Sequence, residues 1–423
     1  MSNNDSNSGF LRNVATLVTG TLIAQVISVL SMYFLLKYFF SPSNHSQASW
    51  IYNLIMVFAS ISSLRLETAI VLEHNEKKEH FLIQFCLKLI AVFAVFGLLF
   101  ATILYFVNDS ANQFLSNWNI ILIPIGIFVF GVVQLLNQYH VHKENYKLLS
   151  GNKIIQSLTR TGSQIGFGAI GINSIGLVLG QIVGGLAALI PLALRTPFKK
   201  IRNSILDNQE RKETLQKHKK FILFTTPATL LGKLIEFVFI HQFITYFNPD
   251  MAGNLTASFT LIGMVILVVA GSFSQVYYKN ISKINNAQEL LRDYIFWVKR
   301  LSILSTLGLI LVWLLPNELG NTILGPEWIY LIPVVKVMSV WMSVMFISSS
   351  LSYIFIKINK QEVNIILDLV HLILVSASIY FSYSWYQDFE TSLWWFSVTQ
   401  TIFYAAVILI SLTLIKQYQP ENS

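Results

Sequence analysis

Long apolar runs separated by short polar connections dominate the sequence. A helix that crosses the hydrocarbon core of a membrane needs about 20 apolar residues, whereas the strands of a membrane barrel alternate in polarity over about 10 residues. The runs here are long and continuous, so they predict membrane-spanning helices. We place twelve of these helices at residues 12–38, 48–72, 82–107, 119–141, 149–171, 175–194, 221–246, 253–277, 294–315, 330–356, 362–384 and 392–415.

Positive charge occupies alternate connections between these spans. Nearly all lysines and arginines outside the spans fall at residues 77–78, 143–147, 195–220, 279–292 and 357–360, while the opposite connections hold mainly acidic residues. Connections on the cytoplasmic side of a membrane carry an excess of these cations. The pattern therefore predicts a multi-pass protein whose basic connections and both termini lie in the cytoplasm. One missed span would have inverted every later connection, so the unbroken alternation also supports the number of spans.

Composition narrows the class of protein further. The 423 residues are 54% hydrophobic and only 12% charged, roughly half the charged fraction of a soluble domain. The net charge of +8 sits between spans, where it sets topology and contacts anionic headgroups, so we expect no nucleic-acid partner. Cys86 lies alone in an apolar run, which predicts neither a disulfide nor a metal site, and we expect no cofactor. Residues 1–9 lack a basic segment, so no cleaved signal peptide is expected.

The basic connection at residues 195–220 divides the chain into two halves of six spans, residues 1–218 and 219–423. The sequence YFFSP at 38–42 follows the first span, and YFNP at 246–249 follows the seventh. Six is an even number, so both halves face the same way. We predict an all-α integral membrane protein with two six-helix lobes. A pseudo-two-fold axis along the membrane normal would relate the lobes and leave a central cavity between them near the midplane.

Glycine motifs in the fifth and sixth spans indicate helix packing. Residues 166–171 (GFGAIG) match a dinucleotide-binding pattern, but that fingerprint requires a preceding strand and a soluble helix. Gly176, Gly180 and Gly184 recur every fourth residue, which predicts a smooth face against a neighbouring helix. The chain has no P-loop pattern, so nucleotide hydrolysis is not expected to supply energy here.

Polar residues follow one face of the fifth span. Lys153, Gln156, Arg160 and Gln164 recur at three- and four-residue spacing, so they share one side of a helix. Arg160 falls close to the midplane, where an ionisable side chain usually faces protein or a water-filled interior. The stripe predicts a cationic cavity lining. A network of hydrogen bonds between helices, without a role in transport, is the alternative.

Two further pairs of ionisable residues lie inside predicted spans. Lys233 and Glu236 are three residues apart in the seventh span, and Asp368 and His371 are three apart in the eleventh. Either pair could be structural, or could bind substrate or a coupling ion, with Asp368 and His371 suited to a proton. Pro227 removes a backbone hydrogen bond early in the seventh span.

Gln25 and Asn53 could add neutral donors to the same cavity. The excess of midplane cations favours an anionic substrate such as a phosphate or pyrophosphate, whose oxygens accept hydrogen bonds from arginine and lysine. A cationic drug would instead favour carboxylates and aromatic faces.

Four motifs resemble one transporter family. They are N-V-x-x-L-x-x-G-T-x-x-x-Q at 13–25, L-R-L-E-x-A-I-V-L at 64–72, G-P-E-W at 325–328 and, more weakly, Q-V-Y-Y at 275–278. Over its whole length the chain resembles the Wzx-type flippases for O-antigen and other polysaccharide repeat units, of the multidrug/oligosaccharidyl-lipid/polysaccharide exporter superfamily. The family often has a glycine in the turn after the first span, whereas Pro42 is followed here by Ser43, Asn44 and His45.

The resemblance implies transfer of an undecaprenyl-pyrophosphate-linked oligosaccharide across the bacterial inner membrane, by alternating access coupled to H⁺ or Na⁺ antiport. It implies no enzymatic activity, and contact with other membrane proteins of polysaccharide assembly. Combined with the residues above, it assigns Arg160, Lys233, Lys153, Gln156, Gln25 and Asn53 to the substrate, and Glu236, Asp368 and His371 to the coupling ion.

Three rival functions remain open at this point. A drug antiporter of the related MATE type would have the same fold but a more acidic cavity. A membrane polysaccharide polymerase or ligase usually needs a large external connection, whereas no predicted external connection here exceeds about a dozen residues. A scaffold without transport activity would leave the midplane charges unexplained.

Overall fold

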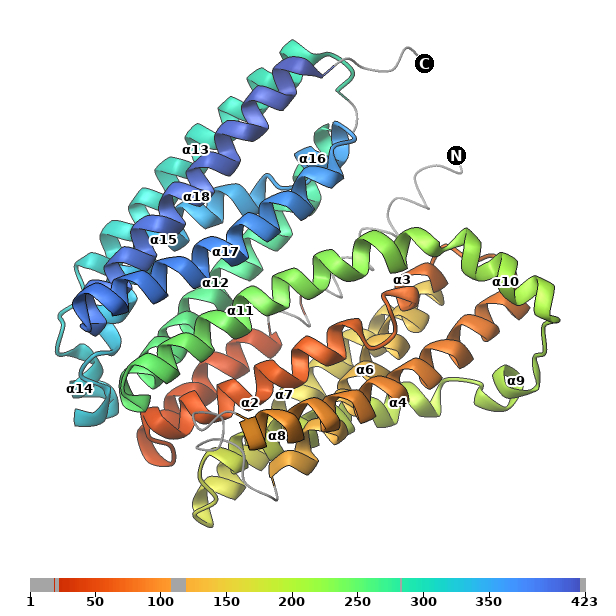
Figure 1. The fold of residues 1–423 in the computed structure, drawn as a ribbon, viewed down its shortest axis with the longest axis horizontal. Coiled ribbons are helices and arrows are strands. Elements are labelled where there is room, and N and C mark those ends of the chain that lie inside the picture. The colour runs from red at the N-terminus through yellow and green to blue at the C-terminus, as the bar shows by residue number, and fades with distance from the viewer. Residues whose placement is uncertain (1–18, 20–22, 108–118, 282–283, 419–423) are drawn as a thin grey trace. The chain divides into compact units, whose positions relative to one another are not determined.

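Helices coincide with all twelve predicted spans in a computed structural model of the chain (Figure 1). The structure describes residues 19, 23–107, 119–281 and 284–418. Within the predicted first span, the described helix runs from Ile23 to Tyr38. The N-terminal segment without a predicted signal peptide, and most of the motif at 13–25, lie outside the described residues.

The first half contains eight labelled α-helices. They are α2 (Pro42–Ile61), α3 (Leu66–Ile70), α4 (Glu76–Val107), α6 (Leu122–His142), α7 (Tyr146–Ala169), α8 (Ser174–Leu194), α9 (Phe198–Asn203) and α10 (Asn208–Lys217). A 3₁₀ turn, Asn119–Ile121, leads into α6. The second predicted span is therefore broken into α2 and α3, because Leu64 and Arg65 both adopt a left-handed backbone conformation between them.

The second half begins with a π-helical turn, Phe221–Thr225, that leads into α11 (Thr226–Tyr246). The remaining helices are α12 (Pro249–Ile281), α13 (Ala287–Trp313), α14 (Leu319–Leu324), α15 (Leu331–Ser350), α16 (Ile354–Lys357), α17 (Gln361–Tyr386) and α18 (Phe389–Gln417). Among the described residues, nine helices are long and apolar enough to cross a membrane. The other three spans are the shorter Ile23–Tyr38 helix and the more polar α2 and α7.

The chain forms two compact units. The first comprises residues 1–40 and 47–237, and the second comprises residues 41–46 and 238–423. The predicted boundary between residues 218 and 219 lies near the end of the basic connection and stays a prediction. The first compact unit extends further along the chain, and the second resumes at Val238, within α11.

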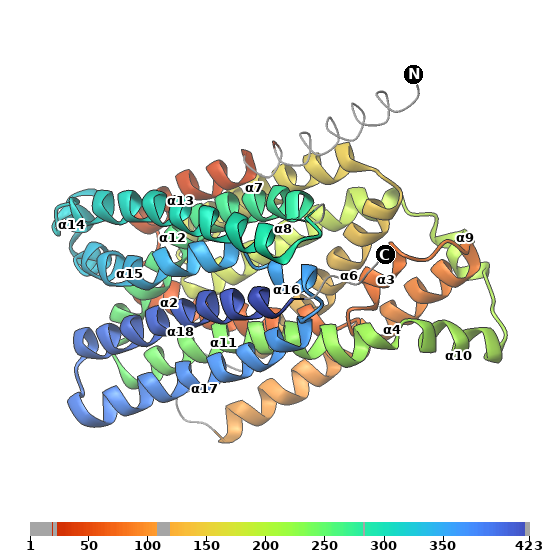
Figure 2. The same cartoon turned by 90° about the horizontal axis from the view of Figure 1, so that it is seen from above.

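The same pairs of spans pack together inside each unit. In the first unit α4 packs on α6, α6 on α8 and α7 on α8. In the second unit the equivalent spans pair in the same way, with α13 on α15, α15 on α18 and α17 on α18 (Figure 2). This common pairing supports the predicted repeat, and the pseudo-two-fold axis itself stays a prediction.

The two proline turns that suggested the repeat play equivalent structural roles. Pro42 is the first residue of α2 and Pro249 is the first residue of α12, a position that suits proline because its missing N–H would have no helical partner there. Both turns belong to the second unit and touch, since Ser46 Oγ donates to the Pro249 carbonyl at 2.9 Å. A Cβ on Gly253 would lie 1.9 Å from the Pro42 carbonyl oxygen, so this contact requires glycine.

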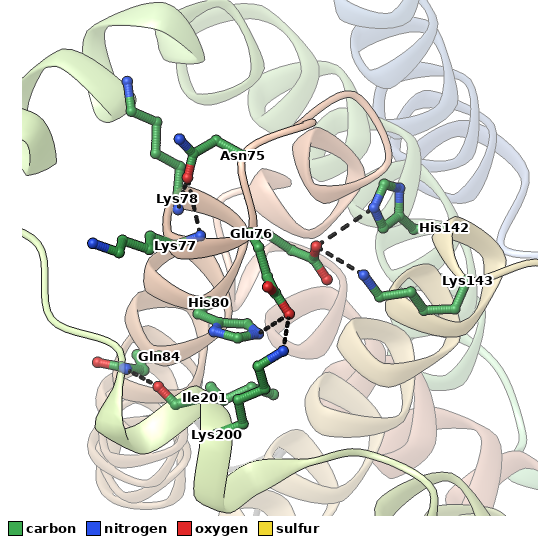
Figure 3. Close-up of polar contacts among 11 residues, drawn as sticks. Asn75, Glu76, Lys77, Lys78, His80, Gln84, His142, Lys143, Lys200 and Ile201 are labelled. Carbon is green, nitrogen blue, oxygen red and sulfur yellow. Dashed lines mark hydrogen bonds and ion pairs between the residues drawn. The ribbon is translucent and has the colours of Figure 1, made fainter.

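Three glutamates, Glu73 just before α4 and Glu76 and Glu79 in its first turn, organise the basic end of the first unit. They are spaced by three residues, and each lies near one lysine and one histidine: Glu73 near Lys217 and His218, Glu76 near Lys200 and His80, and Glu79 near Lys143 and His142. Figure 3 shows the contacts of Glu76 and those of His142 and Lys143. The lysines come from two connections, 143–147 and 195–220, and the glutamates flank a third at 77–78. The charge pattern assigned all three connections to one side of the membrane, and in the first unit they do meet.

Stability should depend on pH through Glu73. Burial raises the pKa of its carboxyl, but hydrogen bonds from Lys217 and His218 outweigh that effect and lower the pKa from 4.5 to about 2. The stabilisation is fully present above the unfolded-state pKa and is lost as pH falls toward the folded value. We expect a loss of about 2 kcal/mol between pH 6 and pH 3.

Thermal unfolding of the purified protein in detergent, followed by tryptophan fluorescence over this pH range, measures the effect of Glu73. The Glu73→Gln variant should show a flatter dependence on pH, because its side chain does not titrate. An unchanged slope in the variant would show that other carboxylates dominate the acid sensitivity.

Candidate functional site

Close packing of α7 on α8 fixes the position of Arg160. A Cβ on Gly184 would lie 2.8 Å from Arg160 Cβ and 3.0 Å from the Gln156 carbonyl oxygen. A Cβ on Gly180 would lie 2.3 Å from Gln164 Cγ. The predicted smooth glycine face is therefore confirmed at these two positions, where the absence of side chains lets the two helices approach each other.

The polar stripe of α7 divides between two neighbours. Gln164 is buried, and its Nε2 donates to the Leu177 carbonyl of α8 at 3.0 Å. The Arg160 guanidinium reaches the Ile23–Tyr38 helix, where Nη2 donates to Ser28 Oγ at 2.5 Å. The Ser157 and Ser28 hydroxyls lie 3.2 Å apart beside it. Gln164 thus serves helix packing, while Arg160 faces the first span.

Arg160 carries a charge that no carboxylate in the described part of the chain pairs with. It stands 14 residues from the start of the 24-residue α7, or about 21 Å along a helix of about 36 Å. The side chain is partly exposed within its unit. A cation at this depth normally faces a partner or a wet interior, so Arg160 is suited to meet an anionic group.

The other predicted substrate residues lie on neighbouring turns. Lys153 and Gln156 are half-buried on α7, and Gln25 is half-buried on the first helix three residues before Ser28. Asn53 on α2 donates from Nδ2 to the Ser49 carbonyl of its own helix at 2.8 Å. In this structure the Asn53 side chain therefore bonds to the backbone of its own helix, and its assignment to substrate stays a prediction.

Lys233 and Glu236 form an ion pair midway along α11, with Nζ and Oε2 2.7 Å apart. Their side chains are 35% and 30% exposed within the unit, so other groups can still reach both. The π-helical turn that precedes α11 is consistent with the backbone hydrogen bond lost at Pro227, because the Thr226 N–H bonds to the Phe221 carbonyl five residues back.

Tyr52 of α2 lies near both Arg160 of α7 and the Lys233–Glu236 pair of α11. It lies close enough to both Arg160 and Glu236 to interact electrostatically with each. Its ring also packs edge-on against Phe130 of α6, with centroids 5.7 Å apart. Tyr52 therefore lies near charged groups of both α7 and α11, and Arg160 in turn bonds to the first span.

Asp368 and His371 belong to a separate cluster on α17 in the second unit. His371 Nε2 contacts Gln400 Oε1 of α18 at 2.5 Å, and the imidazole stacks on Phe403 with centroids 4.3 Å apart. Tyr404 lies edge-on to the same imidazole and within electrostatic range of Asp368. The buried Gln400 Nε2 has no hydrogen-bond partner among the described residues, which leaves one unused donor beside the histidine.

The three candidate coupling-ion residues therefore fall in two units, with Glu236 in the first and Asp368 and His371 in the second. Sequence reasoning did not single out Ser28, Tyr52 or Gln400. Gln400 lies near the middle of α18, so the depth criterion used for the charged residues could have found it. Within the described residues, no group of three or more histidine, cysteine or acidic side chains could hold a metal ion.

Several solved transporter structures share this fold. A MOP superfamily transporter from Pyrococcus furiosus, described as having a binding pocket of reverse polarity, is 11% identical, and the alignment covers 96% of each chain with a TM-score of 0.63. The lipid II flippase MurJ in an inward closed conformation is 14% identical over 95% of this chain and 89% of MurJ, with a TM-score of 0.66. An outward-facing MATE family transporter is 12% identical over 96% of each chain, with a TM-score of 0.63.

Comparison of sequences alone finds no relative of this chain. No protein-family model matches the chain, and no curated protein is detectably similar in sequence. At 11 to 14% identity the structural matches establish the fold and not the substrate. The chain is a multi-pass helical membrane protein with the fold shared by transporters of the MOP superfamily.

Proposed function

We propose that this protein is a flippase that moves an undecaprenyl-pyrophosphate-linked oligosaccharide repeat unit from the cytoplasmic to the periplasmic leaflet of the bacterial inner membrane. In this proposal both termini and the basic connections are cytoplasmic. Transport proceeds by alternating access and supplies repeat units for O-antigen or another surface polysaccharide.

The observation that carries the proposal is the unpaired charge of Arg160 halfway along α7, held by Ser28. A planar guanidinium offers several donors in a fixed arrangement that matches phosphate oxygens. Among the described residues its side chain bonds to a neutral hydroxyl and to no carboxylate, so a pyrophosphate would supply the missing negative charge. Lys153, Gln156, Gln25 and Asn53 would extend the substrate site along the neighbouring helices.

Lys233 and Glu236 give the site a means of exchange. When pyrophosphate approaches Lys233, the lysine can leave Glu236 for the substrate, and the released carboxylate can take up H⁺ or Na⁺. Asp368 and His371 would provide a second position for the coupling ion. The resemblance of the motifs at 64–72 and 325–328 to Wzx-type flippases supports this assignment.

A variant that swaps the charges of Lys233 and Glu236 tests whether the pair exchanges partners during transport or has only a structural role. The variant Lys233→Glu with Glu236→Lys keeps an ion pair three residues apart on the same helix, so we expect it to reach the membrane at normal levels. We expect transport to fall at least tenfold, because the charge near Tyr52 is reversed and the lysine that would meet the substrate moves to the other position of the pair. Surface polysaccharide at matched protein level is the measurement, and full activity would assign the pair to structure alone.

Deletion of the gene in the native host, followed by analysis of lipid-linked sugars, tests the proposed function directly. We expect surface polysaccharide to disappear and a complete lipid-linked repeat unit to accumulate on the inner leaflet, inaccessible to an impermeant glycosidase added to spheroplasts. Normal polysaccharide with increased sensitivity to cationic drugs would favour a MATE-like antiporter. Translocated but unpolymerised or unattached repeat units would favour a polymerase or ligase.

A further inference from the structure

The short helix α9 is fixed to the side of α4 at the basic end of the first unit (Figure 3). Ile201 of α9 points into the protein and is 2% exposed. Gln84 of α4 donates from Nε2 to the carbonyl oxygens of Ile201 and Ser204, the latter at 3.1 Å. Lys200 Nζ lies 2.5 Å from Glu76 Oε1. These contacts from two sides hold α9 in one orientation.

The contact with α4 also sets the depth of α9 in the membrane. α4 has 32 residues, or about 48 Å of helix, which exceeds a hydrocarbon core of about 30 Å by about 18 Å. Gln84 stands eight residues from the start of α4, or about 12 Å along it. If the excess length is shared between the two ends, α9 lies at the boundary between hydrocarbon and headgroups.

The outward side of this segment carries large apolar residues. Leu194 ends α8, Phe198 begins α9 and Ile205 follows α9, and they are 81%, 36% and 76% exposed. In water such exposure would be unfavourable. At the membrane boundary these side chains can enter the acyl region, as the apolar face of an interfacial helix does.

Three cations accompany these apolar residues. Arg195, Lys199 and Arg202 are all exposed, and none forms an ion pair with a residue in the described ranges. Neighbouring lysines of the same connection differ, because Lys200 pairs with Glu76 and Lys217 pairs with Glu73. The structure therefore separates lysines that hold the connection in place from cations that remain available at headgroup level.

We propose that residues 194–205 form a binding site for an anionic phospholipid of the surrounding bilayer. Arg195, Lys199 and Arg202 would donate to its phosphate oxygens, while Phe198 and Ile205 pack against its acyl chains. The site belongs to the outer surface of the first unit and is independent of the transported substrate. Its chemistry predicts preference for a net negative headgroup such as phosphatidylglycerol over zwitterionic phosphatidylcholine.

Native mass spectrometry of the full chain in detergent, titrated separately with phosphatidylglycerol and phosphatidylcholine, measures this preference. The variant Lys199→Gln with Arg202→Gln should bind phosphatidylglycerol about thirty-fold more weakly, the equivalent of about 1 kcal/mol for each removed charge. Arg211→Gln with Lys212→Gln is the matched control, because it removes the same charge from exposed positions on α10 without large exposed apolar neighbours. We expect the control to stay within threefold of the unchanged protein.

A second variant, Phe198→Ser with Ile205→Ser, keeps every charge and should weaken phosphatidylglycerol binding about tenfold. If thermal unfolding shows that the charge variant does not fold, this second variant tests the proposal instead. Equal binding of the two lipids, or equal losses in the α10 control and the α9 charge variant, would overturn the proposal and leave only nonspecific attraction to the basic end.

Discussion

Arg160→Ala should abolish transport while leaving the protein folded in the membrane. The guanidinium donates to Ser28 and is the deep cation for which the described residues provide no carboxylate. In the proposed function, removing it would delete at least two charge-assisted hydrogen bonds to pyrophosphate, and each such bond contributes about 1.5 to 3 kcal/mol. We therefore expect at least about a hundredfold loss of flipping rate.

Surface polysaccharide and the leaflet distribution of lipid-linked sugars measure this loss in cells that express each variant equally. Arg160→Lys retains the charge but not the planar fork, so an intermediate activity is expected. Lys88→Ala is the matched control, since it removes an exposed cation from α4 in the same unit, and we expect no effect. Full activity of Arg160→Ala would remove Arg160 from the substrate site and with it the main support for the proposed function.

The largest effect on stability is expected at the break between α2 and α3. Glu67 is only 1% exposed, and its Oε1 lies 3.1 Å from Arg65 Nη1. Ser63 Oγ also donates to the Glu67 carboxylate. Arg65→Ala would leave a buried carboxylate with a hydroxyl as its remaining side-chain partner, and removing one member of such a pair costs about 3 kcal/mol or more. A lower thermal unfolding midpoint of the purified variant measures this effect.

Combining Arg65→Ala with Glu67→Leu separates the pair from its surroundings. A leucine at the buried position removes the unpaired charge, so the double variant should recover much of the stability lost in Arg65→Ala. The resulting double-mutant cycle reports the interaction energy of the pair. If the double variant is less stable than Arg65→Ala, then Glu67 makes a stabilising contribution that does not depend on Arg65.

The break at Arg65 also shows where a sequence pattern is insufficient. The apolar run at 48–72 correctly predicts a helical span, but Leu64 and Arg65 turn the backbone into the left-handed region. Leucine and arginine have no special preference for that conformation. Burial of the Glu67 carboxylate with its partners accompanies the turn, and those contacts are invisible in hydrophobicity.

The same limit applies to the candidate site. Spacing correctly placed Lys153, Gln156, Arg160 and Gln164 on one side of a helix, but it could not show that Gln164 bonds to α8 while Arg160 bonds to the first span. Likewise, Lys233 and Glu236 were recognised as a possible pair, whereas the role of Tyr52 beside Glu236 and Arg160 depends on helices from distant parts of the chain.

The sequence by itself determined the membrane class and the positions of the helices that coincide with the twelve predicted spans. It could do so because each of these depends on the length and charge of a single helix in an oily layer. Only the tertiary structure decided which charges are paired and which are available, as for Glu67 and Arg160, because pairing depends on side chains that meet across helices. The same reason explains why Gly180 and Gly184 could be recognised as packing residues from sequence, while the partners they admit on α7 could not.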